Sequence, residues 1–312
     1  MTAGESQQQP VATRGPHDIT SSRRRASPVP AVLLLATVWC AACAGPLVKL
    51  PAGPGAPAPD ADDALTDATV ACRAVLTLSA EVGVSGSVGG RRLRGSLLVG
   101  VAPPASARIE AVAPAGPPIF IFVANGAGDD AATLLLPRDN RVLQHGRPDA
   151  VLAAVAGPPL DAQELRETLT GCPPLAAAAN GRQFGANWRV VTVGSTDVYL
   201  RRNAQPGRWQ LVAALHHANR GDAASARDDW RSEYADFEAG LPRTIRLANA
   251  DGKRFDLHLK LSQVETNARL GPEVFRVQIP PDADPITLDE LRRSGPLGTA
   301  SDSTPKTPRT QR

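Results

Sequence analysis

Cysteine, histidine and serine are the side chains of this chain whose types and spacing could support chemistry. The sequence contains four cysteines, and the first two, Cys40 and Cys43, form a C-x-x-C pair. That spacing is used by zinc sites and by redox dithiols. No strand–helix–strand pattern surrounds the pair and no second C-x-x-C is present for zinc, so neither chemistry is favoured.

The other candidates lack the partners that catalysis or metal binding requires. His216 and His217 are adjacent, and adjacent side chains on a strand point to opposite faces, so they do not converge on one ion. Ser85 and Ser87 lie among glycines but lack the G-x-S-x-G order of a nucleophile elbow. We therefore expect no enzyme activity, no metal site and no cofactor.

The apolar segment before Cys43 accounts better for the paired cysteines. An arginine cluster at 23–25 is followed by an apolar run at 32–39 and by two alanines at 41–42, the pattern of a secretory signal. The run is shorter than the ~20 residues that span a bilayer. The alanines before Cys43 resemble a lipobox, although Cys40 replaces its usual aliphatic residue. We therefore expect residues 1–42 to be an N-terminal extension and signal peptide.

Cleavage at this point makes Cys43 the first residue of an acylated bacterial lipoprotein; an ordinary signal peptide that is cut nearby is the alternative. Export implies an oxidising compartment, where Cys72 and Cys172 are expected to form a disulfide. That bond would tie the first helix to the mid-chain helices. Two buried free thiols at these positions remain the other interpretation.

Composition divides the mature chain into a tether, a folded domain and a tail. Residues 43–61 are rich in Pro, Gly and Ala, which predicts a lipid anchor and disordered linker. Residues 294–312 have the composition of a disordered tail, so the domain occupies 62–293. The net charge is only +3, and no basic patch is interleaved with aromatic residues, so nucleic acid is not an expected partner.

Hydrophobic periodicity predicts a mainly β (α+β) fold. A helical pattern at 61–78 is followed by about six strand patterns, two short helices and about seven further strands. Alternation is clearest in RFDLHLKLSQV, residues 254–264, where every second residue is apolar. EVFRVQIP, residues 273–280, is expected to be the last strand. Successive antiparallel strands in this number predict one sheet that curls to cover its apolar face.

Three stretches resemble the lipoprotein-localisation family of the receptor LolB and the periplasmic carrier LolA. They are ARIEAVAPAGPPIFIF at 107–122, DAVLAAVAGPPLDAQELRETLTGCP at 149–173 and LPRTIRLANADGKRFDLHLKLSQVETN at 241–267. The resemblance implies an unclosed barrel with an N-terminal helix and a helical lid, around an apolar cavity that holds acyl chains. Here the second half is longer than in LolB, which suggests a divergent member.

The resemblance also implies site residues. The cavity lining would comprise Phe120, Phe122, Leu135, Phe255, Leu257, Leu259, Leu261 and Phe275. The alternative is that these side chains simply fill a core. The turn that delivers cargo to the membrane in LolB corresponds to Pro114, Ala115 and Gly116. Because Ala115 replaces a large aliphatic residue, either Ile119 or Phe120 supplies the apolar contact, or delivery is not this protein's function.

Two functions follow from these observations. The first is a monomeric, lipid-anchored envelope lipoprotein that binds acyl chains of lipoproteins or lipids, with a periplasmic LolA-like carrier as a candidate partner. Ala44 after the anchor residue favours the periplasmic side of the outer membrane by analogy with known sorting. The second is a structural or sensory envelope lipoprotein that uses the same fold for protein–protein interaction.

Overall fold

The computed structural model describes residues 47–294, apart from 127, 174–177, 204–206 and 218–228. The predictions for the signal peptide, for acylation of Cys43 and for the tail beyond 294 lie outside the described residues. Within the described part, no helix is long and apolar enough to cross a membrane.

The described residues contain one fifteen-stranded sheet. Its strands are β1 (Ala56–Pro57), β2 (Leu78–Val88), β3 (Arg91–Ala102), β4 (Ser106–Val112), β5 (Ile121–Asn125), β6 (Ala132–Leu136), β7 (Arg141–Gly146), β8 (Ala178–Phe184), β9 (Trp188–Val193), β10 (Thr196–Arg202), β11 (Trp209–His216), β12 (Trp230–Glu238), β13 (Leu241–Asn249), β14 (Phe255–Thr266) and β15 (Asp284–Pro285). The helices are α1 (Ala61–Arg73), α2 (Pro148–Ala156), α3 (Ala162–Thr170), α4 (Leu288–Ser294) and a 3₁₀ turn, η2 (Pro272–Phe275).

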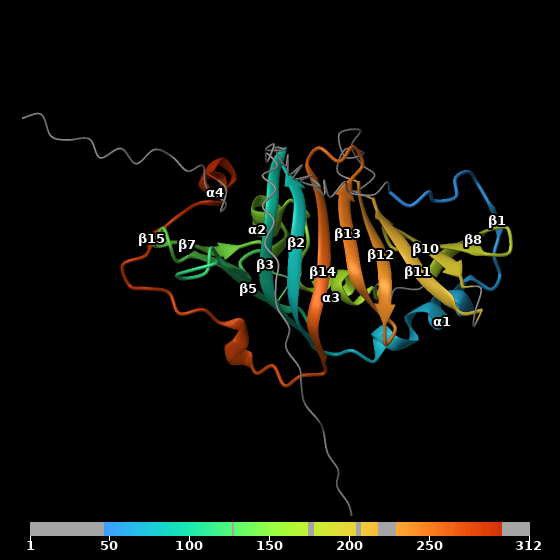
Figure 1. The fold of residues 1–312 in the computed structure, drawn as a ribbon, viewed down its shortest axis with the longest axis horizontal. Coiled ribbons are helices and arrows are strands. Elements are labelled where there is room, and N and C mark those ends of the chain that lie inside the picture. The colour runs from blue at the N-terminus through green and yellow to red at the C-terminus, as the bar shows by residue number, and fades with distance from the viewer. Residues whose placement is uncertain (1–46, 127, 174–177, 204–206, 218–228, 295–312) are drawn as a thin grey trace, which may run out of the picture. The chain divides into compact units, whose positions relative to one another are not determined.

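The sheet consists of two antiparallel meanders, β2–β7 and β8–β14. They are joined where β14 pairs with β2, at the centre of Figure 1. The short strands β1 and β15 are its two edges, so the sheet curls without closing. Side chains of α1, α2 and α3 pack against one face of the sheet and form a single hydrophobic core with it. We call this face of the sheet the inner face and the opposite one the outer face. The predicted succession of strands, two helices and further strands is confirmed, although β8 was not predicted and residues 273–280 form no strand.

Local sequence signals determine where α2 and α3 begin and end. Pro148 occupies the first turn of α2, and Gly157 ends it with φ 98°. Asp161 caps α3: its Oδ1 accepts from the Glu164 backbone N–H at 2.7 Å, and the Glu164 carboxylate accepts from the Asp161 N–H at 2.9 Å. Gly171 ends α3 in the left-handed conformation with φ 64°. The two helices therefore lie against the inner face as short separate segments.

The first helix begins at Ala61, directly after Asp60. Asp60 is its N-cap, and Asp62 and Asp63 lie in the first turn. The Asp60 carboxylate accepts two hydrogen bonds from Arg189, at 2.7 Å from Nε and 2.8 Å from Nη2. This bidentate pair lowers the pKa of Asp60 and holds the start of α1 against β9.

The linker predicted at 43–61 is a docked segment over its described part. The Val48 N–H donates to Glu233 Oε1 at 2.8 Å, and Leu50 packs on an outer-face cluster that includes Tyr199. Strand β1 then pairs with β8, with Ala56 opposite Gln183. Pairing of this kind covers an otherwise open sheet edge, which explains why a Pro/Gly-rich segment is ordered here.

The prediction of a last strand at 273–280 is wrong. Residues 272–275 form the turn η2, which packs on the outside of β4 and β5. No free sheet edge is available there because β4 already pairs with β3 and β5. The segment is held by side chains instead: Arg108 donates to the carbonyls of Val274 and Arg276, and Asn125 to that of Phe275.

A disulfide joins Cys72 of α1 to Cys172, which follows α3. The Cα atoms lie 5.5 Å apart, within the range that a disulfide spans. The structure thus brings together the two cysteines that the sequence paired. The bond attaches the end of α3 to a helix that packs on β8 to β11.

Candidate functional site

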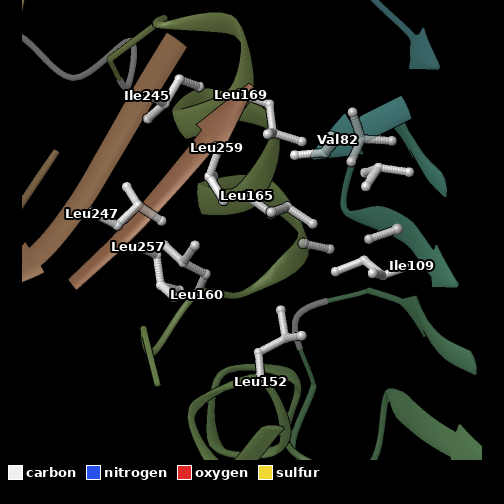
Figure 2. Close-up of a cluster of buried hydrophobic side chains, with 14 of the residues drawn as sticks. Val82, Ile109, Leu152, Leu160, Leu165, Leu169, Ile245, Leu247, Leu257 and Leu259 are labelled. Carbon is white, nitrogen blue, oxygen red and sulfur yellow. The ribbon is translucent and has the colours of Figure 1, made fainter. Parts of the chain in front are cut away.

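An apolar cavity of about 120 Å³ lies between the inner face and the helices α2 and α3. Its walls come from β2, β3, β4, β13 and β14, from both helices and from the connection between them. Figure 2 shows Leu152, Leu160 and Leu165 of the helical segment directed towards Leu257 and Ile109 of the sheet. The lining is almost entirely hydrocarbon, with Arg94 and Ser96 as its polar residues, which suits an apolar ligand.

A glycine in β3 leaves the inner face open at one side of the cavity. In this row Leu259 pairs with Val84, and Val84 pairs with Gly95. Gly95 lines the cavity but contributes no side chain to it. A Cβ atom on Gly95 would have no heavy atom within 4 Å. Strand register therefore places an open position beside Leu259 and Val84 at the cavity wall.

Most of the inner face away from the cavity is filled. Phe122, Leu134 and Phe255 are at most 1% exposed, and Ile109, Phe122 and Leu134 lie side by side across β4, β5 and β6. The cavity is smaller than the ~300–1,000 Å³ of typical small-molecule sites. In this conformation it therefore accommodates a short apolar segment.

The structure distributes the predicted lining residues between the cavity, the filled core and the opposite face. Phe120, Leu257 and Leu259 form part of the cavity wall. Three others are buried on the same inner face within the filled core: Phe122, Phe255 and Leu261.

Leu135 and Phe275 lie on the outer face and do not line the cavity. Leu135 pairs with Ile121 and Val142, whereas its neighbour Leu134 pairs with the inward Phe122. Residues 134–136 are all leucine, so alternation could not identify which leucine points inward. Phe275 is buried by η2 on the outside of β4 and β5.

The turn predicted for membrane delivery borders the mouth of the cavity. Pro114, Ala115 and Gly116 are exposed. Ile119 is half-buried, lines the cavity and donates its N–H to the Ala111 carbonyl at 2.9 Å. Val112, at the start of the turn, is 40% exposed and also lines the cavity. Apolar surface therefore continues from the cavity to the outside.

A second pocket, of about 320 Å³, lies on the other side of α3 against β9 to β12 and has a mixed polar and apolar lining. Desolvation raises the pKa of Glu164 to about 7 and raises that of Glu167. Desolvation, with a smaller effect of the neighbouring His217, lowers the pKa of His216 to about 3. The neutral His216 ring stacks on Trp230 with 3.7 Å between ring centroids. Helix α3 thus separates an apolar cavity from a pocket with a mixed lining that includes titratable groups.

His217 lies apart from His216, as alternation predicts. Its Nε2 is 3.3 Å from Asp197 Oδ2 and its Nδ1 is 3.2 Å from Asp229 Oδ2. Among the described residues, no group of histidine, cysteine and carboxylate side chains could hold a metal ion. Sequence periodicity gave no sign of either pocket, because both depend on how α3 lies across the sheet.

No family model and no curated protein matches the chain. Similar solved structures include a LolA superfamily protein from Nitrosomonas europaea, at 12% identity over 70% of this chain and 97% of that chain, with a TM-score of 0.48. A domain described as an outer membrane lipoprotein-sorting protein from Vibrio parahaemolyticus is 11% identical over 69% and 97%, with a TM-score of 0.44. The lipoprotein LppX from Mycobacterium tuberculosis is 12% identical over 68% and 99%, with a TM-score of 0.28.

Proposed function

We propose that this protein is a lipid-anchored envelope lipoprotein that binds an acyl chain in the apolar cavity between the sheet and α2–α3. Its role would resemble that of LolB, in transfer or localisation of lipoproteins or lipids at the outer membrane. The observation that carries the proposal is the hydrocarbon-lined cavity, which continues to an exposed apolar turn. Uptake and release are non-covalent, without enzyme activity, and burial contributes about 0.8 kcal/mol per CH₂.

A chain longer than the cavity requires part of the lid to move. The disulfide attaches the end of α3 to α1, so α3 is the fixed part. Helix α2 ends at Gly157, and the connection through Leu160 lines the cavity. We therefore propose that α2 and the connection at 157–160 move outward when the acyl chain enters.

Titration of the delipidated full chain with a fluorescent long-chain fatty acid tests this function. We expect saturable binding at one site and competition by unlabelled long-chain fatty acid. Native mass spectrometry after gentle extraction should also detect co-purified lipid or acylated peptide. A protein that binds no acyl chain but captures a protein partner would contradict the proposal and support the structural or sensory alternative, which the largely filled inner face favours.

Acylation of Cys43 is expected to attach the domain to the membrane. Cys43→Ser should abolish labelling with a clickable fatty acid and release the protein from the membrane fraction, because the thiol is the acylated group. Cys40→Ser is the matched control and should keep both properties. If Cys40→Ser loses the label and Cys43→Ser keeps it, the processing site is wrong.

A further inference from the structure

We propose that the mouth of the apolar cavity is a docking surface for a bilayer with anionic head groups, an inference that rests on the proposed function. The surface consists of Arg91, Arg92 and Arg94 of β3 on one side and of Arg138 beside the 113–118 turn on the other. We call these four residues the cationic rim. The apolar residues Val112 and Ile119 of the cavity wall lie at the turn.

Strand lengths place the first three arginines at the mouth. Strand β3 extends past the end of β4, since its last pair with β4 joins Ser96 to Val112. Residues 91–95 of β3 therefore pair with β2 alone, and Arg94 and Gly95 line the opening of the cavity. The side chains of Arg91, Arg92 and Arg94 are exposed. Within the described residues, no ion pair is formed by any of the three.

Arg138 brings a fourth cation to the turn. Its guanidinium donates to the Ala115 carbonyl at 3.0 Å and to the Pro117 carbonyl at 3.3 Å. The side chain is exposed, as is that of the next residue, Asp139. The cationic rim thus has four exposed arginines, and Asp139 is the exposed acid next to Arg138.

Charge complementarity identifies the partner as an anionic bilayer. Arginines near such a surface gain electrostatic attraction, and apolar side chains beside them enter the boundary between head groups and acyl chains. Val112, which is 40% exposed, is placed to make the apolar contact. A bilayer that docks here faces the open end of the cavity, so an acyl chain would pass between the two without crossing water.

Vesicle binding by the full chain tests the proposal, with Cys43→Ser in every sample so that no acyl anchor contributes. The vesicles are phosphatidylcholine alone or equal parts phosphatidylcholine and phosphatidylglycerol. We expect tighter binding to the anionic vesicles, weakened by salt. Arg91→Gln combined with Arg92→Gln should weaken it by about fivefold per arginine, so roughly 25-fold; both side chains are exposed and neither lines the cavity. Arg138 is left unchanged because it also holds the turn.

The matched control is Arg269→Gln combined with Arg276→Gln, two exposed cations remote from the mouth; it should change binding less than twofold. Equal binding to both vesicles, or equal loss in the two double variants, would overturn the proposal. Fatty-acid titration of the same samples distinguishes it from the proposed function, since the rim variant should still bind the acyl chain. If the rim variant loses acyl binding but binds vesicles as before, these arginines contact the head group of the bound ligand. That result would overturn the docking proposal.

Discussion

Gly95→Leu is expected to abolish acyl-chain binding while the protein stays folded. Gly95 lines the cavity, and a Cβ atom there meets no heavy atom within 4 Å. A leucine side chain can therefore occupy the space that the ligand needs. Leucine is also favoured over glycine at a strand position. The backbone φ of Gly95 lies outside the left-handed region, so a leucine can adopt it without strain. Stability should be unchanged or slightly increased, because apolar surface fills a cavity.

Fluorescent fatty-acid titration and thermal unfolding of the same sample measure the two effects separately. Gly83→Leu is the matched control: Gly83 lies on β2 opposite Ser96 and Lys260, and a Cβ atom there makes one ordinary contact, 3.7 Å from the Lys260 carbonyl. It does not line the cavity, so binding should persist. A folded Gly95→Leu protein with undiminished affinity would place the acyl site elsewhere.

Replacing both Cys72 and Cys172 with alanine should lower the free energy of unfolding by roughly 4–5 kcal/mol in the chain-entropy model. The size follows from the sequence separation of 100 residues, because cross-linking distant residues restricts the unfolded chain strongly. Urea unfolding of the wild-type and double-variant proteins, both without reductant, measures the difference. The variant should also release bound acyl chains faster, since the end of α3 is no longer attached to α1.

Reductant provides the control for this prediction. Reduced wild-type protein should unfold at nearly the same urea concentration as the double variant, whereas the variant should not respond to reductant. A mass map of the exported protein that finds two free thiols at these positions would contradict the prediction. So would a double variant as stable as the oxidised wild type.

Local signals were enough to predict most of the strands, the helices α1 to α3 and several of their boundaries. Alternation in residues 255–261 assigns Phe255, Leu257, Leu259 and Leu261 to one face, and the structure buries all four there. Asp161 and Gly171 delimit α3 as capping rules predict. These signals work because they depend on neighbours one to four residues away, which the chain itself specifies.

The tertiary structure decided which surfaces are covered and where the cavity lies. Alternation could not orient Leu135, because Leu134 and Leu136 are equally apolar and both sheet faces are buried there. The strand-like segment 273–280 found no free edge, whereas the Pro/Gly-rich segment at 47–60 found one beside β8. The cavity itself requires β14 to pair with β2 and β2 with β3, which brings Leu259, Val84 and Gly95 from three segments into one row. Such long-range register is a property of the assembled sheet, and no local pattern in the sequence contains it.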